Sequence, residues 1–245
     1  LLPDNVARET ERQLEQLIGL FWDIGLDIGH SVRTVWQCAD EAARDITVQT
    51  NLLESRLICG SRSLYAEFTR TIQSQLDPRA FFKGKRLEQE ERHVRYQETP
   101  YALEPNCKES PGGLRDLQVI LWIGRAAGLG ESWNDLARRG YITRGEELQL
   151  KGLETFLRHV RIRLHLLTAR HEDRLLFDHQ EAVAGRFGIS AGKARRASEL
   201  LMQRYFRTAK SVTQLNTILL QNLGAEIFPE KNKAPIVINE RFQMD

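Results

Sequence analysis

The sequence is poor in features that would place it in a specialised class of protein. It has three cysteines, Cys38, Cys59 and Cys107, and no pair of them has the Cys-x-x-Cys spacing. This wide spacing argues against a disulfide framework or a zinc site and favours a reducing compartment, so we expect a cytoplasmic protein. No apolar run approaches the length of a membrane span, and no signal peptide opens the chain, so we expect no membrane partner.

The chain also lacks a strong excess of charge of either sign. Its 35 Lys and Arg residues nearly balance 33 Asp and Glu residues, for a formal net charge of +2. This balance gives no overall attraction to nucleic acid, so we expect no nucleic-acid partner. The hydrophobic content of 41% is ordinary for globular proteins, and 245 residues can bury one sizeable core or two smaller ones.

Apolar residues recur at steps of three and four along most of the chain, which predicts a mainly α protein. Asn5 is expected to cap a first helix that ends near Gly25, and Asp45 and Ser61 to cap later ones. Asp77-Pro78 interrupts the pattern and marks a domain boundary. Further helices are expected over 34–43, 45–58, 61–76, 78–96, 114–127, 132–139, 144–171, 178–187 and 193–223.

The character of these helices differs along the chain. The 78–96 segment is densely charged, which is typical of a solvated helix. The 144–171 and 193–223 segments carry continuous apolar stripes, which fit the core of an antiparallel bundle better than a cofactor site.

A short strand fits Leu26 to Arg33. It would place Asp27, Ser31 and Arg33 on one face, where they could hold a metal or a triphosphate. An ordinary salt bridge between Asp27 and Arg33 is the alternative.

The most informative stretch runs from Leu103 to Leu117. Its two prolines favour extended backbone, and Gly112-Gly113 allow a tight turn into a helix that begins at Leu114. A helix N-terminus favours an anion, and Lys108 and Arg115 stand beside the turn. The alternative is that the glycines only turn the chain and that Arg115 pairs with a nearby acid such as Glu109.

Five segments in register carry a family resemblance: 20–34 (LFWDIGLDIGHSVRT), 45–57, 103–116 (LEPNCKESPGGLRD), 174–178 (RLLFD) and 239–242. Together they resemble the bifunctional uridylyltransferase/uridylyl-removing enzymes that modify the nitrogen-signalling protein PII. The glutamine synthetase adenylyltransferases share a Gly-Gly-hydrophobic-Arg-Asp motif and are an alternative. The segments 30–34 and 103–105 favour the uridylyltransferases.

The resemblance implies a domain organisation. Such enzymes begin with a polymerase-beta-like nucleotidyltransferase domain and continue into a helical domain, an HD-type hydrolase domain and two ACT domains. The present sequence has neither an Asp-x-Asp motif nor a His-Asp dipeptide. We therefore expect the C-terminal part of an α/β nucleotidyltransferase domain over 1–77, an antiparallel helical bundle over 78–223, and a linker over 224–245 toward a missing HD-type domain.

Such a piece of a longer protein is expected to be inactive alone, and a non-catalytic helical protein-interaction module is the alternative. The implied reaction is attack of a PII tyrosine on the α-phosphate of UTP, assisted by Mg²⁺. Asp27 is then the expected catalytic and metal-binding carboxylate, with Asp23 as second choice. The nucleotide-binding residues are expected to be Ser31, Arg33, Lys108, Gly112, Gly113 and Arg115.

Overall fold

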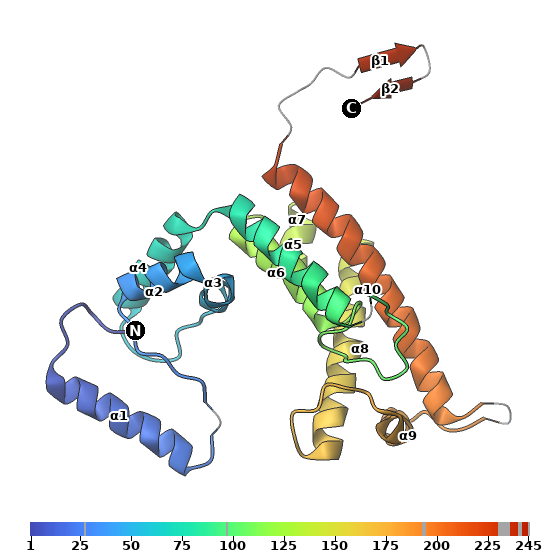
Figure 1. Cartoon of the computed structure of the whole chain (residues 1–245), viewed down its shortest axis with the longest axis horizontal. Coiled ribbons are helices and arrows are strands. Elements are labelled where there is room, and N and C mark those ends of the chain that lie inside the picture. Colours follow the sequence, from blue (N-terminus) through green and yellow to red (C-terminus); the bar gives the residue numbers. More distant parts are fainter. Residues whose placement is uncertain (27, 97, 193–194, 230–235, 240–241, 245) are drawn as a thin grey trace. The chain divides into compact units, whose positions relative to one another are not determined.

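The computed structural model describes residues 1–245 apart from 27, 97, 193–194, 230–235, 240–241 and 245. The described residues are mainly helical, as predicted, and form two compact units, Leu1–Asp77 and Pro78–Asp245 (Figure 1). Each unit is described by itself below. No helix among the described residues is long and apolar enough to cross a membrane.

The first unit contains α1 (Arg8–Asp23), α2 (Val35–Arg44), α3 (Ile46–Leu53) and α4 (Arg62–Gln75). Its caps follow the sequence: Asp45 accepts the N–H groups of Thr47 and Val48, and Ser61 accepts that of Leu64, as predicted. The core forms between α2 and α4, which contribute Val35, Cys38, Ala39, Ala42, Phe68 and Ile72.

Two predictions for the start of the chain are wrong. Asn5 does not cap α1, because the helix begins at Arg8 and its N-cap residue, Ala7, makes no side-chain cap. The described residues between Leu26 and Arg33 form no strand. A strand needs a neighbour that pairs along its length. Here the nearest ladder is a single parallel bridge of Leu2 with Thr34, where the Leu2 N–H donates to Arg33 O at 3.0 Å.

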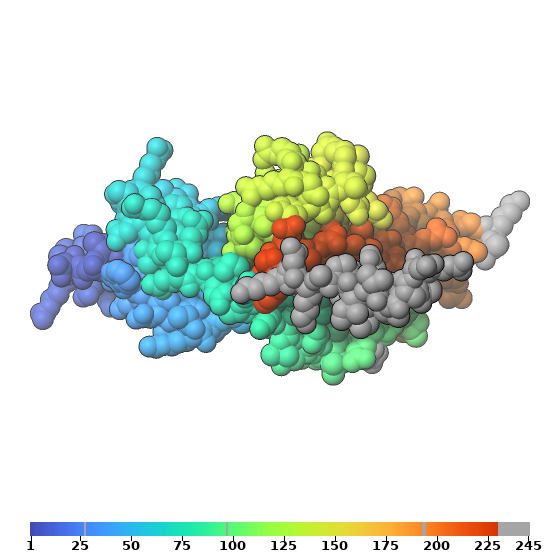
Figure 2. All heavy atoms as spheres, turned by 90° about the horizontal axis from the view of Figure 1, so that it is seen from above, coloured from blue at the N-terminus to red at the C-terminus, as the bar shows by residue number. Residues whose placement is uncertain are grey.

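The second unit contains six helices and a short antiparallel hairpin among its described residues. They are α5 (Pro78–Arg95), α6 (Leu114–Ala126), α7 (Trp133–Arg138), α8 (Arg144–Thr168), α9 (Phe177–Arg186), α10 (Ala197–Ile227), β1 (Ile236–Asn239) and β2 (Phe242–Met244). The α10 helix, which extends past the predicted end at residue 223, packs against α5, α6, α8 and α9. Figure 2 shows its orange and red spheres between yellow-green and green segments of the same unit.

The packing of α10 explains one further correction. The densely charged α5 is not a wholly solvated helix, because Phe81, Lys85 and Gln89 are buried on the face toward α6 and α10. Lys85 is only 3% exposed and pairs with Glu88 at 2.7 Å. Gln89 donates to Asn216 of α10 at 2.7 Å. The second unit therefore holds polar contacts as well as apolar stripes in its interior.

Candidate anion site at the glycine turn

Two of the recognised sequence segments meet in space. Asn106 and Arg174 form an antiparallel bridge, and the Cys107 N–H donates to Asp173 O at 2.8 Å. One residue after Arg174 and one residue before Asn106, the Leu175 N–H donates to Pro105 O, also at 2.8 Å. The 103–116 segment and the 174–178 segment are thus two sides of a single structural element.

The glycine turn packs directly against α10. Gly112 has φ +77°, and a Cβ at this position would lie 2.3 Å from the Ala209 carbonyl oxygen. A Cβ on Gly113 would lie 2.8 Å from the carbonyl oxygens of Lys108 and Ser110. Both glycines are therefore required by the turn and by its close approach to neighbouring backbone.

The N–H groups of this turn are engaged within the chain. Gly112 donates to the Asp116 carboxylate at 2.7 Å. The next donors reach backbone carbonyls: Gly113 to Ser110, Leu114 to Cys107, and Arg115 to Lys108. In this structure the N–H groups of Gly112 and Gly113 are therefore engaged within the chain, because the loop folds back to satisfy the helix N-terminus itself. Nucleotide binding at these two glycines stays a prediction.

Asp116 is the central residue of the turn, and the sequence analysis did not identify it. Its side chain is fully buried, and it accepts from Arg92 at 2.7 Å and faces His93 Nε2 at 2.9 Å. Burial raises the pKa of this carboxyl, but the His93 hydrogen bond and the Arg92 charge outweigh it, so the pKa is lowered. The ionised carboxylate only accepts, so His93 Nε2 carries the proton. The sequence signal that could have identified Asp116 is the presence of an acid in the first turn of α6.

The predicted cations lie beside this turn. Arg115 Nη2 lies 3.0 Å from Glu109 Oε1, which is the pairing that the alternative interpretation expected. Its guanidinium also stacks over the Trp122 ring at 5.2 Å. Lys108 Nζ lies 3.4 Å from the same Glu109 oxygen. Burial raises the pKa of Glu109, but Arg115, Lys108 and Arg92 outweigh it and lower the pKa.

A second acid, which is partly buried, holds the partner loop. Asp173 accepts from Arg161 Nε at 2.6 Å and faces His165 Nε2 at 2.9 Å, both on α8. Because the Asp173 carbonyl also accepts the Cys107 N–H, α8 is tied through this residue to the loop before the glycine turn. Sequence reasoning missed Asp173 as well.

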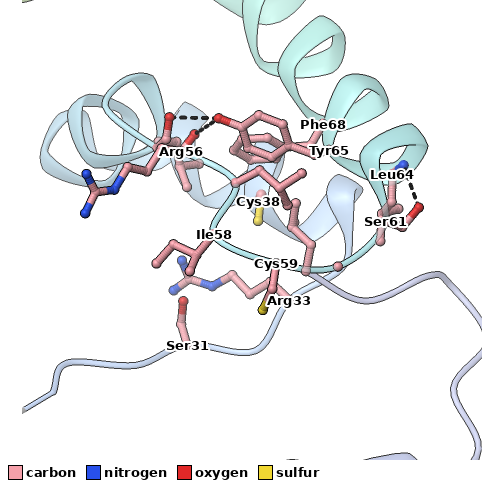
Figure 3. Close-up of a pocket in the computed structure, with 15 residues that line it drawn as sticks. Ser31, Arg33, Cys38, Arg56, Ile58, Cys59, Ser61, Leu64, Tyr65 and Phe68 are labelled. Carbon is pink, nitrogen blue, oxygen red and sulfur yellow. Dashed lines mark hydrogen bonds between the residues drawn. The ribbon is translucent and has the colours of Figure 1, made fainter.

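The remaining predicted residues belong to the first unit. Ser31 and Arg33 line a cavity of about 350 Å³ together with Arg56, Cys59 and Tyr65. Figure 3 shows the Ser31 hydroxyl directed toward the Arg33 guanidinium, with Cys59 beside it. Arg33 lies 3.8 Å from Glu41. The structure thus brings Ser31 and Arg33 to one pocket, although not on a strand face.

Two carboxylates were expected at the metal site, Asp27 as first choice and Asp23 as second. Asp27 lies outside the described residues, and Asp23 ends α1 as an exposed residue. Within the described ranges, no three His, Cys, Asp or Glu side chains are grouped so as to hold a metal ion. Magnesium binding by Asp27 stays a prediction.

Comparison with known proteins decides the family. A model of the GlnD PII-uridylyltransferase family matches residues 80–220, which span the glycine turn and most of the second unit. A bifunctional uridylyltransferase/uridylyl-removing enzyme of Aromatoleum aromaticum is 63% identical over 243 residues, which is 99% of this chain and 28% of that protein. The chain belongs to the PII-uridylyltransferase family. This confirms the resemblance found in the sequence.

Other members of the PII-uridylyltransferase family match almost as fully. Enzymes of the same name from Nitrosospira multiformis and Cupriavidus pinatubonensis are 56% and 55% identical and cover 99% and 96% of the chain. The chain spans 28% and 27% of their lengths. No solved structure matches the chain.

Proposed function

We propose that the chain is part of an enzyme that transfers UMP from UTP to a tyrosine of PII and also removes it. The observation that carries the proposal is the 63% identity to a bifunctional uridylyltransferase/uridylyl-removing enzyme across 99% of the chain. Since the chain spans about a quarter of such relatives, the activity belongs to the complete protein. The proposed setting is the cytoplasm.

The proposed reaction is attack of the tyrosine hydroxyl on the α-phosphate of UTP, with pyrophosphate as leaving group. Bound Mg²⁺ would supply charge neutralisation for the attacking and leaving oxygens. The phosphate-binding residues proposed for this chain are Ser31 and Arg33 in the first unit, and Lys108 and Arg115 in the second. Asp27 is proposed as the metal-binding carboxylate.

The proposed architecture assigns the first unit to the C-terminal part of a polymerase-beta-like nucleotidyltransferase domain and the second to a helical bundle domain. The absence of an Asp-x-Asp motif supports a further proposal, that the 245-residue chain alone folds but does not transfer UMP. Incubation of the chain with UTP, Mg²⁺ and PII should leave PII unmodified by mass spectrometry. Modification above a blank would overturn this part.

The decisive experiment uses the full-length parent enzyme. With UTP and Mg²⁺ it should add UMP to PII, and Asp27→Asn should abolish transfer while thermal stability is retained. Asp40→Asn, an exposed acid on α2, is the matched control and should remain active. Transfer of AMP from ATP to glutamine synthetase instead would favour the adenylyltransferase alternative. Full activity of Asp27→Asn with normal magnesium dependence would remove Asp27 from the site.

A further inference from the structure

One carboxylate beside the glycine turn is surrounded by three cations. Glu109 lies 3.0 Å from Arg115 Nη2, 3.4 Å from Lys108 Nζ and 3.8 Å from Arg92 Nε. Arg92 also pairs with Asp116. The three cations therefore face two carboxylates, which leaves an excess of one positive charge.

Two of the three cations, Arg115 and Arg92, are held in place independently of the Glu109 carboxylate. Arg115 donates to Gln118 at 3.1 Å and stacks over Trp122. Arg92 donates to the Glu109 carbonyl oxygen at 2.9 Å and to Asp116 at 2.7 Å. A group that replaced the carboxylate would therefore meet two cations that are already positioned.

The Glu109 side chain can leave without disturbing the loop. Its backbone N–H donates to the Asn106 side chain at 2.8 Å, and its carbonyl accepts from Arg92. Rotation of the side chain alone would empty the space between the cations. The side chains of Glu109, Lys108 and Arg115 are 22%, 29% and 28% exposed, so this space is open to solvent.

We propose that Glu109 is a built-in competitor in an anion site formed by Arg92, Lys108 and Arg115, and that a polyphosphate displaces its carboxylate. A polyphosphate carries more negative charge than one carboxylate and accepts several charge-assisted hydrogen bonds at once. The identity of the ligand, the phosphate chain of a nucleotide or free pyrophosphate, rests on the proposed function. The side chains carry this site, because the backbone N–H groups of the turn are engaged.

The test is calorimetric titration of the 245-residue chain with pyrophosphate, UTP and uridine. Glu109→Gln keeps the size of the side chain and removes its charge, and it should bind pyrophosphate about tenfold more tightly than the parent, the value of one charge-assisted contact. Adding Lys108→Ala to this variant should reverse the gain. Glu90→Gln, which removes an exposed carboxylate paired with Arg86 in the same unit, is the control and should leave the affinity unchanged.

Comparison of the three titrations, with pyrophosphate, UTP and uridine, distinguishes a site for phosphate from a site for the whole nucleotide. Equal gains for pyrophosphate and UTP with none for uridine support a phosphate site, and a gain for UTP alone supports a site for the whole nucleotide. Pyrophosphate affinity that is the same in Glu109→Gln and in the parent, with the unfolding temperature retained, would overturn the proposal. Because the binding assay contains no PII, failure of uridylyl transfer in the full-length enzyme would count against the proposed function alone.

Discussion

The carboxylate of Asp116 accepts the backbone N–H of Gly112 at 2.7 Å, so an acid of α6 holds the turn that leads into its own helix. The same carboxylate binds Arg92 and faces His93, both on α5. The backbone carbonyl of Asp116 accepts from the side chain of Asn216 on α10 at 2.7 Å. Three helices and the glycine turn therefore meet at one buried residue.

Gly112→Ala should strongly destabilise the second unit. The new Cβ would meet the Ala209 carbonyl at 2.3 Å, and φ is +77°, so steric overlap adds to backbone strain. We expect a loss of roughly 3 kcal/mol or more in the free energy of unfolding, measured by denaturant titration. Gly128→Ala is the matched control, because its φ is +68° and nothing lies within 4 Å of the added Cβ. A loss of only about 1 kcal/mol is expected there. Equal losses in the two variants would contradict the close-packing explanation.

Asp116→Asn should cost roughly 3 kcal/mol in the free energy of unfolding, because it leaves the nearly buried Arg92 without its carboxylate. Chemical denaturation measures the loss. Glu90→Gln removes an exposed acid paired with Arg86 on the same α5 helix and should cost less than about 1 kcal/mol. A neutral effect of Asp116→Asn would show that the buried pair contributes little.

Stability should decrease in acid because of Asp116, Glu109 and Asp173, whose pKa values are all lowered in the folded chain. Lowered values mean that the unfolded chain takes up protons first. The stabilisation is therefore complete above the ordinary carboxyl pKa of about 4 and is lost as pH falls through the folded values. Unfolding free energy measured from pH 7 to pH 3 should show this slope. Asp116→Asn should have a shallower one, and an identical slope would exclude Asp116 as a contributor.

The three thiols should differ sharply in reactivity. Cys107 is fully buried, and burial raises its pKa to about 12. Burial also raises the pKa of Cys38, whereas Cys59 is exposed at the first-unit pocket. A disulfide reagent should modify one thiol rapidly in the native chain and all three after denaturation. Cys59→Ser should abolish the rapid phase, and a rapid phase that survives this change would refute the assignment.

Lys108→Ala and Arg115→Ala should each raise the KM for UTP in the full-length enzyme about tenfold to a hundredfold, since each removes a cation proposed to contact phosphate. Arg158→Ala is the control, because this α8 cation pairs with Glu154 and should leave UTP use unchanged. Steady-state transfer assays supply the KM, and thermal unfolding checks the fold. A KM within about twofold of the parent in both variants would leave the turn a purely structural role.

Local patterns predicted the helices well, because amphipathic spacing and caps act within a few residues. Asp45 and Ser61 start their helices where the sequence indicated. The prediction of a strand over 26–33 was wrong because an alternating pattern of side chains does not show whether a second strand is available to pair with it. The prediction that α5 is solvated was wrong for a related reason, because Lys85 and Gln89 are buried by helices that are distant in the sequence.

The site was predictable only in part. The family motifs indicated the glycine turn as the candidate site, and the observed Arg115–Glu109 pair was one of the two interpretations of it. Asp116 and Asp173 were missed because the residues that pair with them are distant in sequence. Arg92 lies 24 residues before Asp116, and Arg161 lies 12 residues before Asp173. The backbone N–H groups of the turn are occupied by nearby acceptors, namely the Asp116 carboxylate and the carbonyl groups of Ser110, Cys107 and Lys108, and the motif alone did not indicate this loop conformation.

The bridge between Asn106 and Arg174 closes the intervening chain into a loop without a covalent link. That loop contains the exposed Gly140, which lies between α7 and α8. A backbone cut at this position would leave two pieces still joined by the bridge and by the packing of α10 on α5 and α6. The second unit is thus suited to reassembly from two separately expressed halves. Recovery of the contact between Cys107 and Asp173, which ties α8 to the loop before the glycine turn, would report that the halves have associated.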